Sequence, residues 1–189
     1  MAILNFNRIL QWTDFTEVST PRVAGLTAET WAGFAINFTA RDRKPNGMRA
    51  LRPSAVTVSV GLEPGKSWVL RGSTVPILLR HEQGHHDIAA IAARQCHDEA
   101  LKIEADSDRT LLAAVDTLAR ATIALMQQIQ KVYDDPGCAT AHGANRTMQL
   151  EWAVRIAAAK NDPNGRLTAL AACLPPILPV LLMAVRHVL

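Results

Sequence analysis

The chain of 189 residues is 49% hydrophobic and 20% charged, and its formal net charge is +3. These numbers predict a single domain with a sizeable core, at most extended by an appendage. The slight basic excess argues against a nucleic-acid partner, because its one local cluster, between Arg41 and Arg52, contains Asp42 and no aromatic residue. Three widely spaced cysteines imply no disulfide framework. The N-terminus lacks the apolar segment of a signal peptide, so the expected location is the cytoplasm, or outside it if a leader precedes this sequence.

Residues 1–75 are predicted to form a small antiparallel sheet with many loops. Three segments have the composition of strands: 34–40, 55–60 and 67–70. The second is the clearest, because its valines alternate with Thr57 and Ser59. A helical turn is expected over residues 27–31, and Lys44-Pro45-Asn46-Gly47 is typical of a turn.

Three helices are predicted after residue 72. The first begins at Ser73 or Thr74 and runs to about Glu104. The second is capped by Ser107 or Asp108 and ends at Asp135-Pro136-Gly137. Its apolar positions recur at spacings of four and three, as in the seam of an antiparallel helix hairpin. These positions are Leu111, Val115, Leu118, Thr122, Leu125, Ile129 and Val132. The third helix begins at about Asn145 and carries Met148, Trp152 and Ile156 on one stripe.

The segment 167–185 contains no charged residue, and its length would suit a membrane span. Pro175, Pro176 and Pro179 interrupt it, so a short buried or partner-covered helix pair is favoured over membrane association. The sequence therefore predicts an α+β fold in two parts. Residues 1–160 form the sheet, the helix hairpin packed on it and the third helix, and residues 161–189 form an apolar tail without an assigned role.

Residues 81–85 read His-Glu-Gln-Gly-His within the first predicted helix. His81 and His85 are four positions apart, so they project from one helix face. Two imidazoles at this spacing can hold one zinc ion, and Glu82 can reach a water on that ion. The flanking residues are apolar, which indicates a buried helix, and a buried imidazole pair with a carboxylate needs a compensating charge. We therefore predict one zinc ion at this helix.

A catalytic zinc site needs a third protein ligand. Other candidates on the first helix lie too far along its axis or point away from His81 and His85. The second helix returns the chain toward His81, so residues 134–143 are expected to pass the metal. His142 is the predicted third ligand, and Cys138 in the same loop and Glu151 on the third helix are the alternatives.

Several further blocks resemble those of a bacterial family, the domain-of-unknown-function 922 family, described as proposed zinc-dependent proteases. The blocks are Trp12-Thr13-Asp14-Phe15, Ser67-Trp68-Val69, the stretch from Leu79 to Ala89, Tyr133-Asp134, the stretch from Thr140 to Asn145, and Gln149-Leu150-Glu151-Trp152. The resemblance covers roughly residues 10 to 155. It implies a zincin-like peptidase in which His81 and His85 are ligands, Glu82 is the base and His142 is a ligand.

The predicted function is zinc-dependent hydrolysis of peptide bonds, with a peptide or protein as the substrate. Glu82 takes a proton from the zinc-bound water as that water attacks the carbonyl carbon, and Tyr133 is a candidate donor to the oxyanion. Asp87 is a candidate for orienting a ligand histidine. An extended substrate is expected to pair with an exposed edge strand, for which residues 55–60 are the candidate.

The alternative is a non-catalytic module, either zinc-stabilised or metal-free, whose apolar tail binds a partner or a membrane. A closed site with four protein ligands, including Cys138 and His142, would favour it. A weaker third option is hydrolysis of a non-peptide amide or ester by the same chemistry.

Overall fold

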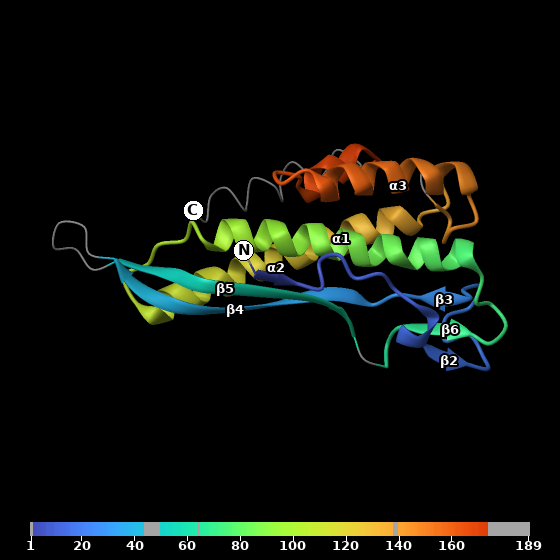
Figure 1. The fold of residues 1–189 in the computed structure, drawn as a ribbon, viewed down its shortest axis with the longest axis horizontal. Coiled ribbons are helices and arrows are strands. Elements are labelled where there is room, and N and C mark those ends of the chain that lie inside the picture. Colours follow the sequence, from blue (N-terminus) through green and yellow to red (C-terminus); the bar gives the residue numbers. More distant parts are fainter. Residues whose placement is uncertain (1, 44–49, 64, 138–139, 174–189) are drawn as a thin grey trace.

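The computed structural model describes residues 2–43, 50–63, 65–137 and 140–173. It has an α+β architecture in which two small sheets lie on one side of three helices (Figure 1). The first sheet has the order β1 (Ala2–Leu4), β5 (Ala50–Leu62) and β4 (Ala32–Arg43). The second has the order β2 (Thr16–Val18), β6 (Trp68–Leu70) and β3 (Ala28–Glu29). The predicted fold class is therefore confirmed at the level of α+β.

Both sheets are mixed, which corrects the predicted antiparallel sheet. β1 pairs in parallel with β5, and β2 pairs in parallel with β6, whereas β4–β5 and β3–β6 are antiparallel. The parallel partners lie about 50 residues apart in the chain, so local alternation of apolar and polar residues carries no signal for them. The helical turn expected over residues 27–31 is also wrong, because Ala28 and Glu29 pair with β6.

Residues 55–60 lie in the central strand of the first sheet and not at its edge. β5 has β1 on one side and β4 on the other, so the predicted substrate-pairing edge is wrong. The prediction that these residues form a strand with a valine face is confirmed, because Val56, Val58 and Val60 are buried in the core. Among the described strands of this sheet, β4 forms an edge, and its first residues line a cavity that residues of α1 and α2 also line.

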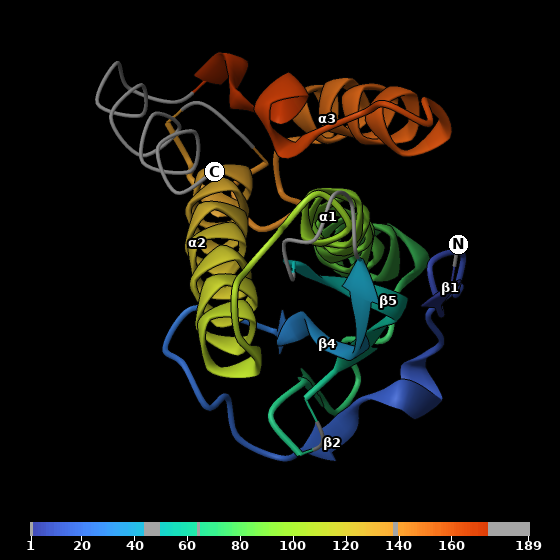
Figure 2. The ribbon, with the colours of Figure 1, turned by 90° about the vertical axis from the view of Figure 1, so that its left-hand side faces the viewer.

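The helix α1 (Pro76–Ala100) is the centre of the molecule, with the first sheet, α2 and α3 around it (Figure 2). It begins at Pro76, whose fixed φ and missing N–H suit the first helical turn. Its residues from Ile88 to Cys96 are buried, and four of them are alanines that allow close approach of neighbours on every side. The helix ends four residues before the predicted Glu104, because Ala105 is drawn into a backbone bridge with Leu51 of β5.

The helix α2 (Asp108–Asp134) returns alongside α1 (Figure 1). As predicted, Ser107 caps it, since its hydroxyl accepts a hydrogen bond from the Thr110 N–H at 3.3 Å. The predicted seam is buried as far as Ile129. At the last turn the buried residue is Tyr133, whereas Val132 is half-buried.

The helix α3 (Arg146–Asn161) packs on α1 from the side opposite the sheets (Figure 2). Its cap is Asn145, and Trp152 and Ile156 are buried as predicted. The short 3₁₀ helix η2 (Leu167–Cys173) follows, and its Leu167 and Leu170 are fully buried in the same core. In the part of the chain that the structure describes, no helix has the length and apolarity to cross a membrane. The predicted apolar tail lies outside the described residues from position 174 onward.

Candidate metal centre

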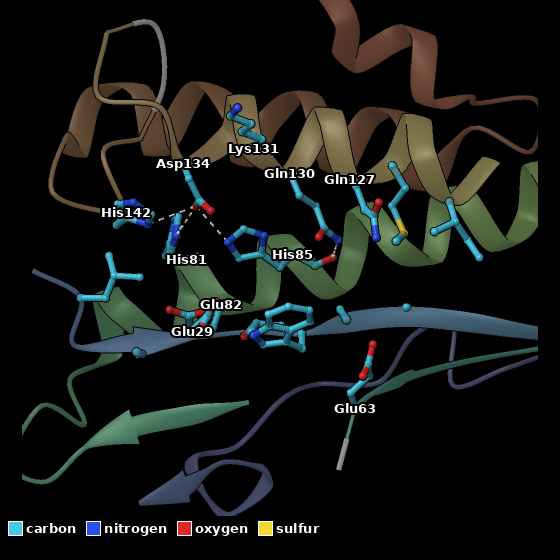
Figure 3. A pocket seen from close by; sticks show the side chains of 18 of the residues that line it. Glu29, Glu63, His81, Glu82, His85, Gln127, Gln130, Lys131, Asp134 and His142 are labelled. Carbon is cyan, nitrogen blue, oxygen red and sulfur yellow. Dashed lines mark hydrogen bonds and ion pairs between the residues drawn. The ribbon is translucent and has the colours of Figure 1, made fainter. Parts of the chain in front are cut away.

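Three imidazoles converge on one carboxylate oxygen where α1 meets the end of α2. Asp134 Oδ1 lies 3.1 Å from His81 Nε2, 3.0 Å from His85 Nε2 and 3.5 Å from His142 Nδ1 (Figure 3). His81 and His85 project from one face of α1, as the motif predicts. Asp134 is the last residue of α2, and His142 lies in the loop that follows. The returning chain thus delivers two further groups to the histidine pair.

The loop after α2 is shaped by left-handed backbone conformations. Ala141, His142 and Gly143 have φ values of 49°, 51° and 81°. Glycine adopts such values without strain, whereas the two other residues are held there by the surrounding structure. A Cβ on Gly143 would also lie 3.1 Å from His81 Cβ, so this position approaches α1 closely. The tight turn keeps His142 beside the cluster with its side chain 45% exposed.

The ring of His81 is oriented by two residues from other elements. Its Nδ1 lies 3.1 Å from Gln149 Oε1 and 3.3 Å from Thr140 Oγ1. The Thr140 hydroxyl donates to the Tyr133 carbonyl, so it accepts from Nδ1. This network assigns the proton of His81 to Nδ1 and leaves the lone pair of Nε2 facing Asp134. Partners of this kind fix the tautomer and orientation of metal-binding histidines.

Tyr133 lies behind His81, with its ring stacked on the imidazole at a centroid distance of 4.7 Å and an angle of 10°. Its hydroxyl donates to the His81 carbonyl at 3.2 Å and accepts from Gln149 Nε2 at 2.7 Å. Burial raises the pKa of Tyr133 far above its ordinary value. Because the hydroxyl is used in these bonds and does not line the cavity around Glu82, the geometry gives Tyr133 a positioning role in place of the predicted oxyanion contact.

Gly84, inside the motif, makes this stacking sterically feasible. A Cβ at this position would collide with the Tyr133 hydroxyl and lie 2.6 Å from its Cζ. Real Cβ atoms do not approach other atoms so closely, and Tyr133 is enclosed by His81, His85 and Trp152. The glycine therefore provides the space in which Tyr133 supports His81.

Replacing Gly84 with alanine is expected to weaken metal binding at this cluster by about 10- to 100-fold, the range typical of outer-sphere changes at metal sites. The added methyl group displaces Tyr133 and with it the bonds that orient His81. Overpacking should also cost about 1–3 kcal/mol of unfolding free energy. Competition with a chromogenic chelator and thermal unfolding measure the two effects.

The matched control is Gly61→Ala, because a Cβ on Gly61 of β5 meets no atom within 4 Å. The metal affinity of this variant should equal that of the wild type. Wild-type affinity in Gly84→Ala would contradict the role assigned to the glycine.

Glu82 lies at the bottom of a cavity of about 510 Å³, which the four residues of the cluster also line. Its side chain is buried, with the residue only 2% exposed, and Oε2 has no hydrogen-bond partner among the described residues. Burial alone would lower the pKa of His85, but the hydrogen bond and charge of Asp134, with the charge of Glu82, raise it on balance. Burial alone would raise the pKa of Asp134, but the two α1 histidines hold it well below its usual range.

The donor set fits a metal ion. Ligand atoms of His81, Asp134 and His142 all lie within 4.8 Å of one another, and His85 Nε2 is adjacent to the same Asp134 oxygen. A buried polar atom without a partner, such as Glu82 Oε2, is costly unless a ligand or water compensates it. Imidazole and carboxylate ligands together suit zinc and related divalent ions.

No role for Asp134 was predicted from the sequence. It lies in the loop that was expected to pass the metal, directly after Tyr133, and carboxylates are common metal ligands. Position alone did not separate it from Asp135, which is exposed and caps α2. Only the backbone direction at the last turn of α2 distinguishes the two.

The remaining candidates lie elsewhere. Cys138 falls outside the described residues. Glu151 is exposed on α3, 3.8 Å from Arg155, and takes no part in the cluster. Asp87 accepts hydrogen bonds from Gln83 at 2.9 Å and Lys160 at 2.7 Å, so the predicted support of a ligand histidine by Asp87 is replaced by that of Gln149 and Thr140.

One comparison with known proteins matches the part of the chain that contains the cluster. No curated protein and no solved structure matches the chain. Residues 72–143 match a family model described as "Bacterial protein of unknown function (DUF922)". The matched stretch contains α1, α2 and the loop through His142, and therefore all four residues of the cluster. Over this region the chain is similar to the DUF922 family of bacterial proteins, whose function is unknown.

Proposed function

We propose that the chain is a zinc-dependent peptidase in which α1 and α2 form a zincin-like hairpin. The observation that carries the proposal is Glu82: a buried carboxylate with an unpaired oxygen, lining the same cavity as the imidazole–carboxylate cluster. A purely structural zinc site has no need of such a group, because all its positions are filled by protein ligands. A hydrolytic site needs a base beside the metal.

We assign His81, His85 and Asp134 as the residues that hold zinc. Their nitrogen–oxygen separations of 3.0 and 3.1 Å are close to the edge of a tetrahedron with zinc–ligand bonds of 2.0–2.1 Å, which is about 3.3 Å. His142 is exposed and 3.5 Å from Asp134, and we assign it to orienting that carboxylate from the solvent side. In this proposal Asp134 takes the place predicted for His142.

Zinc would supply Lewis acidity, which polarises the peptide carbonyl and lowers the pKa of a water molecule. Glu82 accepts the proton that this water loses as its oxygen bonds to the carbonyl carbon. The same carboxyl group then transfers the proton to the leaving amine as the carbon–nitrogen bond breaks. Tyr133, Gln149 and Thr140 hold His81 in place throughout.

The substrate strand would pair with the edge of β4 beside the cluster. The Glu63 N–H donates to the Trp31 carbonyl at 2.7 Å, in register with the β4–β5 ladder. Because hydrogen-bonded and non-hydrogen-bonded pairs alternate in an antiparallel ladder, the backbone groups of Ala32 and Phe34 point away from β5. Both residues line the cavity, so an extended peptide fits there by strand addition.

The alternative is a non-catalytic, zinc-stabilised module. One observation favours it: three imidazoles lie beside one Asp134 oxygen, so the cluster offers four potential ligands, and four ligands can close a zinc site. In that case the ion would stabilise the fold, and the chain would act through a partner.

Metal analysis combined with an activity assay tests the proposal. The purified chain should contain one zinc ion and cleave bonds within a mixed peptide library, as detected by mass spectrometry. A chelator should abolish cleavage, and added zinc should restore it. Stoichiometric zinc with no cleavage of any peptide would favour the alternative, and no zinc binding would exclude both.

A further inference from the structure

A second carboxylate, that of Glu29, lies beside the proposed base. Glu29 is the last residue of β3 and lines the cavity together with Glu82 (Figure 3). Figure 3 shows both carboxylates below His81 and His85, on the side of the cluster away from Lys131. The floor of the cavity therefore carries two negative charges next to each other.

A hydrogen bond from a buried tryptophan holds the Glu29 side chain in position. Its Oε2 accepts a hydrogen bond from the Trp68 indole N–H at 2.7 Å, and Trp68 is fully buried. The indole is neutral and bonds to one carboxylate oxygen, so this hydrogen bond leaves the second oxygen of Glu29 for another partner. Among the described residues no lysine or arginine forms an ion pair with it.

The other acids of the cavity differ in this respect. Asp134 is surrounded by imidazoles, and Glu63 pairs with Lys66 at 2.5 Å. Lys131, the one lysine that lines the cavity, lies on the α2 side, across the cluster from Glu29 (Figure 3). Glu82 has an unpaired buried oxygen. On the Glu29 side, Lys66 lies over the Trp31 ring at 4.8 Å but pairs with Glu63, and among the described residues no lysine or arginine pairs with Glu29.

We propose that Glu29 binds an ammonium group of the substrate, next to the bond that is cut. This inference rests on the proposed function and names its substrate class: peptides with a positive charge beside the scissile bond. Glu29 immediately precedes Thr30 and Trp31, which lead into the β4 edge. A peptide paired with Ala32 and Phe34 therefore reaches Glu29 at its end or with a side chain. The ammonium group is either the free α-amine or that of a lysine.

Binding measurements separate these sources. The background is the full chain with Glu82→Gln and zinc, in which turnover is removed. Isothermal titration compares three kinds of apolar hexapeptide: one with a free N-terminus, its N-acetylated form, and a series of acetylated forms with lysine at successive positions. The same series is repeated after Glu29→Gln and after the control Glu17→Gln, which removes an equal charge from β2, where Glu17 pairs with Arg71 outside the cavity.

Charged peptides should bind about 10- to 100-fold more tightly than the neutral acetylated form, as expected for a hydrogen bond to a charged group. Glu29→Gln should abolish this preference, and Glu17→Gln should retain it. A preference for the free N-terminus identifies the α-amine, and one for an acetylated lysine peptide identifies the side chain.

Equal binding of all three kinds of peptide, or a preference that survives Glu29→Gln, would overturn the inference. A Glu29-dependent preference in a chain whose wild type cleaves nothing would support Glu29 as a cation site and reject the peptidase proposal. The two failures are therefore distinguishable.

Discussion

The Glu82→Gln variant is expected to lose peptide hydrolysis while it retains one zinc ion. Glutamine has the shape of glutamate but cannot accept the proton of the attacking water. General bases accelerate such reactions by about 10²- to 10⁴-fold, so the rate of hydrolysis should fall by at least about 100-fold. Zinc should remain because Glu82 is not among the residues within the cluster around Asp134 Oδ1.

The activity assay and the metal analysis are carried out on the same preparation. Glu99→Gln is the matched control, because Glu99 lies on the same helix and pairs with Lys102 at the far end from the motif. This control should keep full activity. Hydrolysis by Glu82→Gln at the wild-type rate would reject the assigned mechanism, and joint loss of zinc and activity would make Glu82 a ligand.

The second large effect is expected from the ligands themselves. His81→Ala and Asp134→Ala should each weaken zinc binding by more than about 100-fold, because an inner ligand contributes more than the 10- to 100-fold of an outer partner. His142→Ala should weaken it by only about 10-fold, since we place this imidazole beside Asp134 and not on the ion. Equilibrium competition with a chelator of known affinity measures each value.

His97→Gln is the control for this series, because His97 lies on α1 but pairs with Asp98, away from the cluster. Its zinc affinity should equal that of the wild type. Strong loss in His142→Ala with little change in Asp134→Ala would restore His142 as the third ligand. Zinc that binds the folded state also stabilises it. With zinc present, the thermal unfolding temperatures of the variants should therefore follow the order of their zinc affinities.

The helices were predictable from the sequence because their signals are local. Ser107 caps α2 through a bond to a residue three positions away, and Pro136 follows the end of the helix at once. The end of α1 was predicted too late, because the bridge between Ala105 and Leu51 joins residues more than 50 positions apart. The parallel pairings of β1 with β5 and of β2 with β6 were not predicted for the same reason, because the paired strands are far apart in the chain.

Within the candidate site, the motif predicted the shared face of His81 and His85, and the hairpin argument predicted that the loop with His142 returns to them. The structure brings these residues together. Asp134 was missed because its role depends on the direction of one side chain at the last turn of α2. Tyr133 was predicted to donate to the oxyanion because its stacking on His81 could not be seen in the sequence. This stacking depends on the free space over Gly84, which becomes evident only once both helices are placed.

The burial of α1 divides the candidate site into two halves with different local stability. His81 and His85 lie one turn before a fully enclosed stretch, so their amides should exchange with solvent only when the whole domain unfolds. Asp134 ends a helix, and His142 lies in an exposed turn with left-handed backbone, so we expect this half to open more readily than α1. Metal loading and release would then proceed through the Asp134–His142 side, at a rate set by local opening, while the two α1 imidazoles remain a fixed cradle.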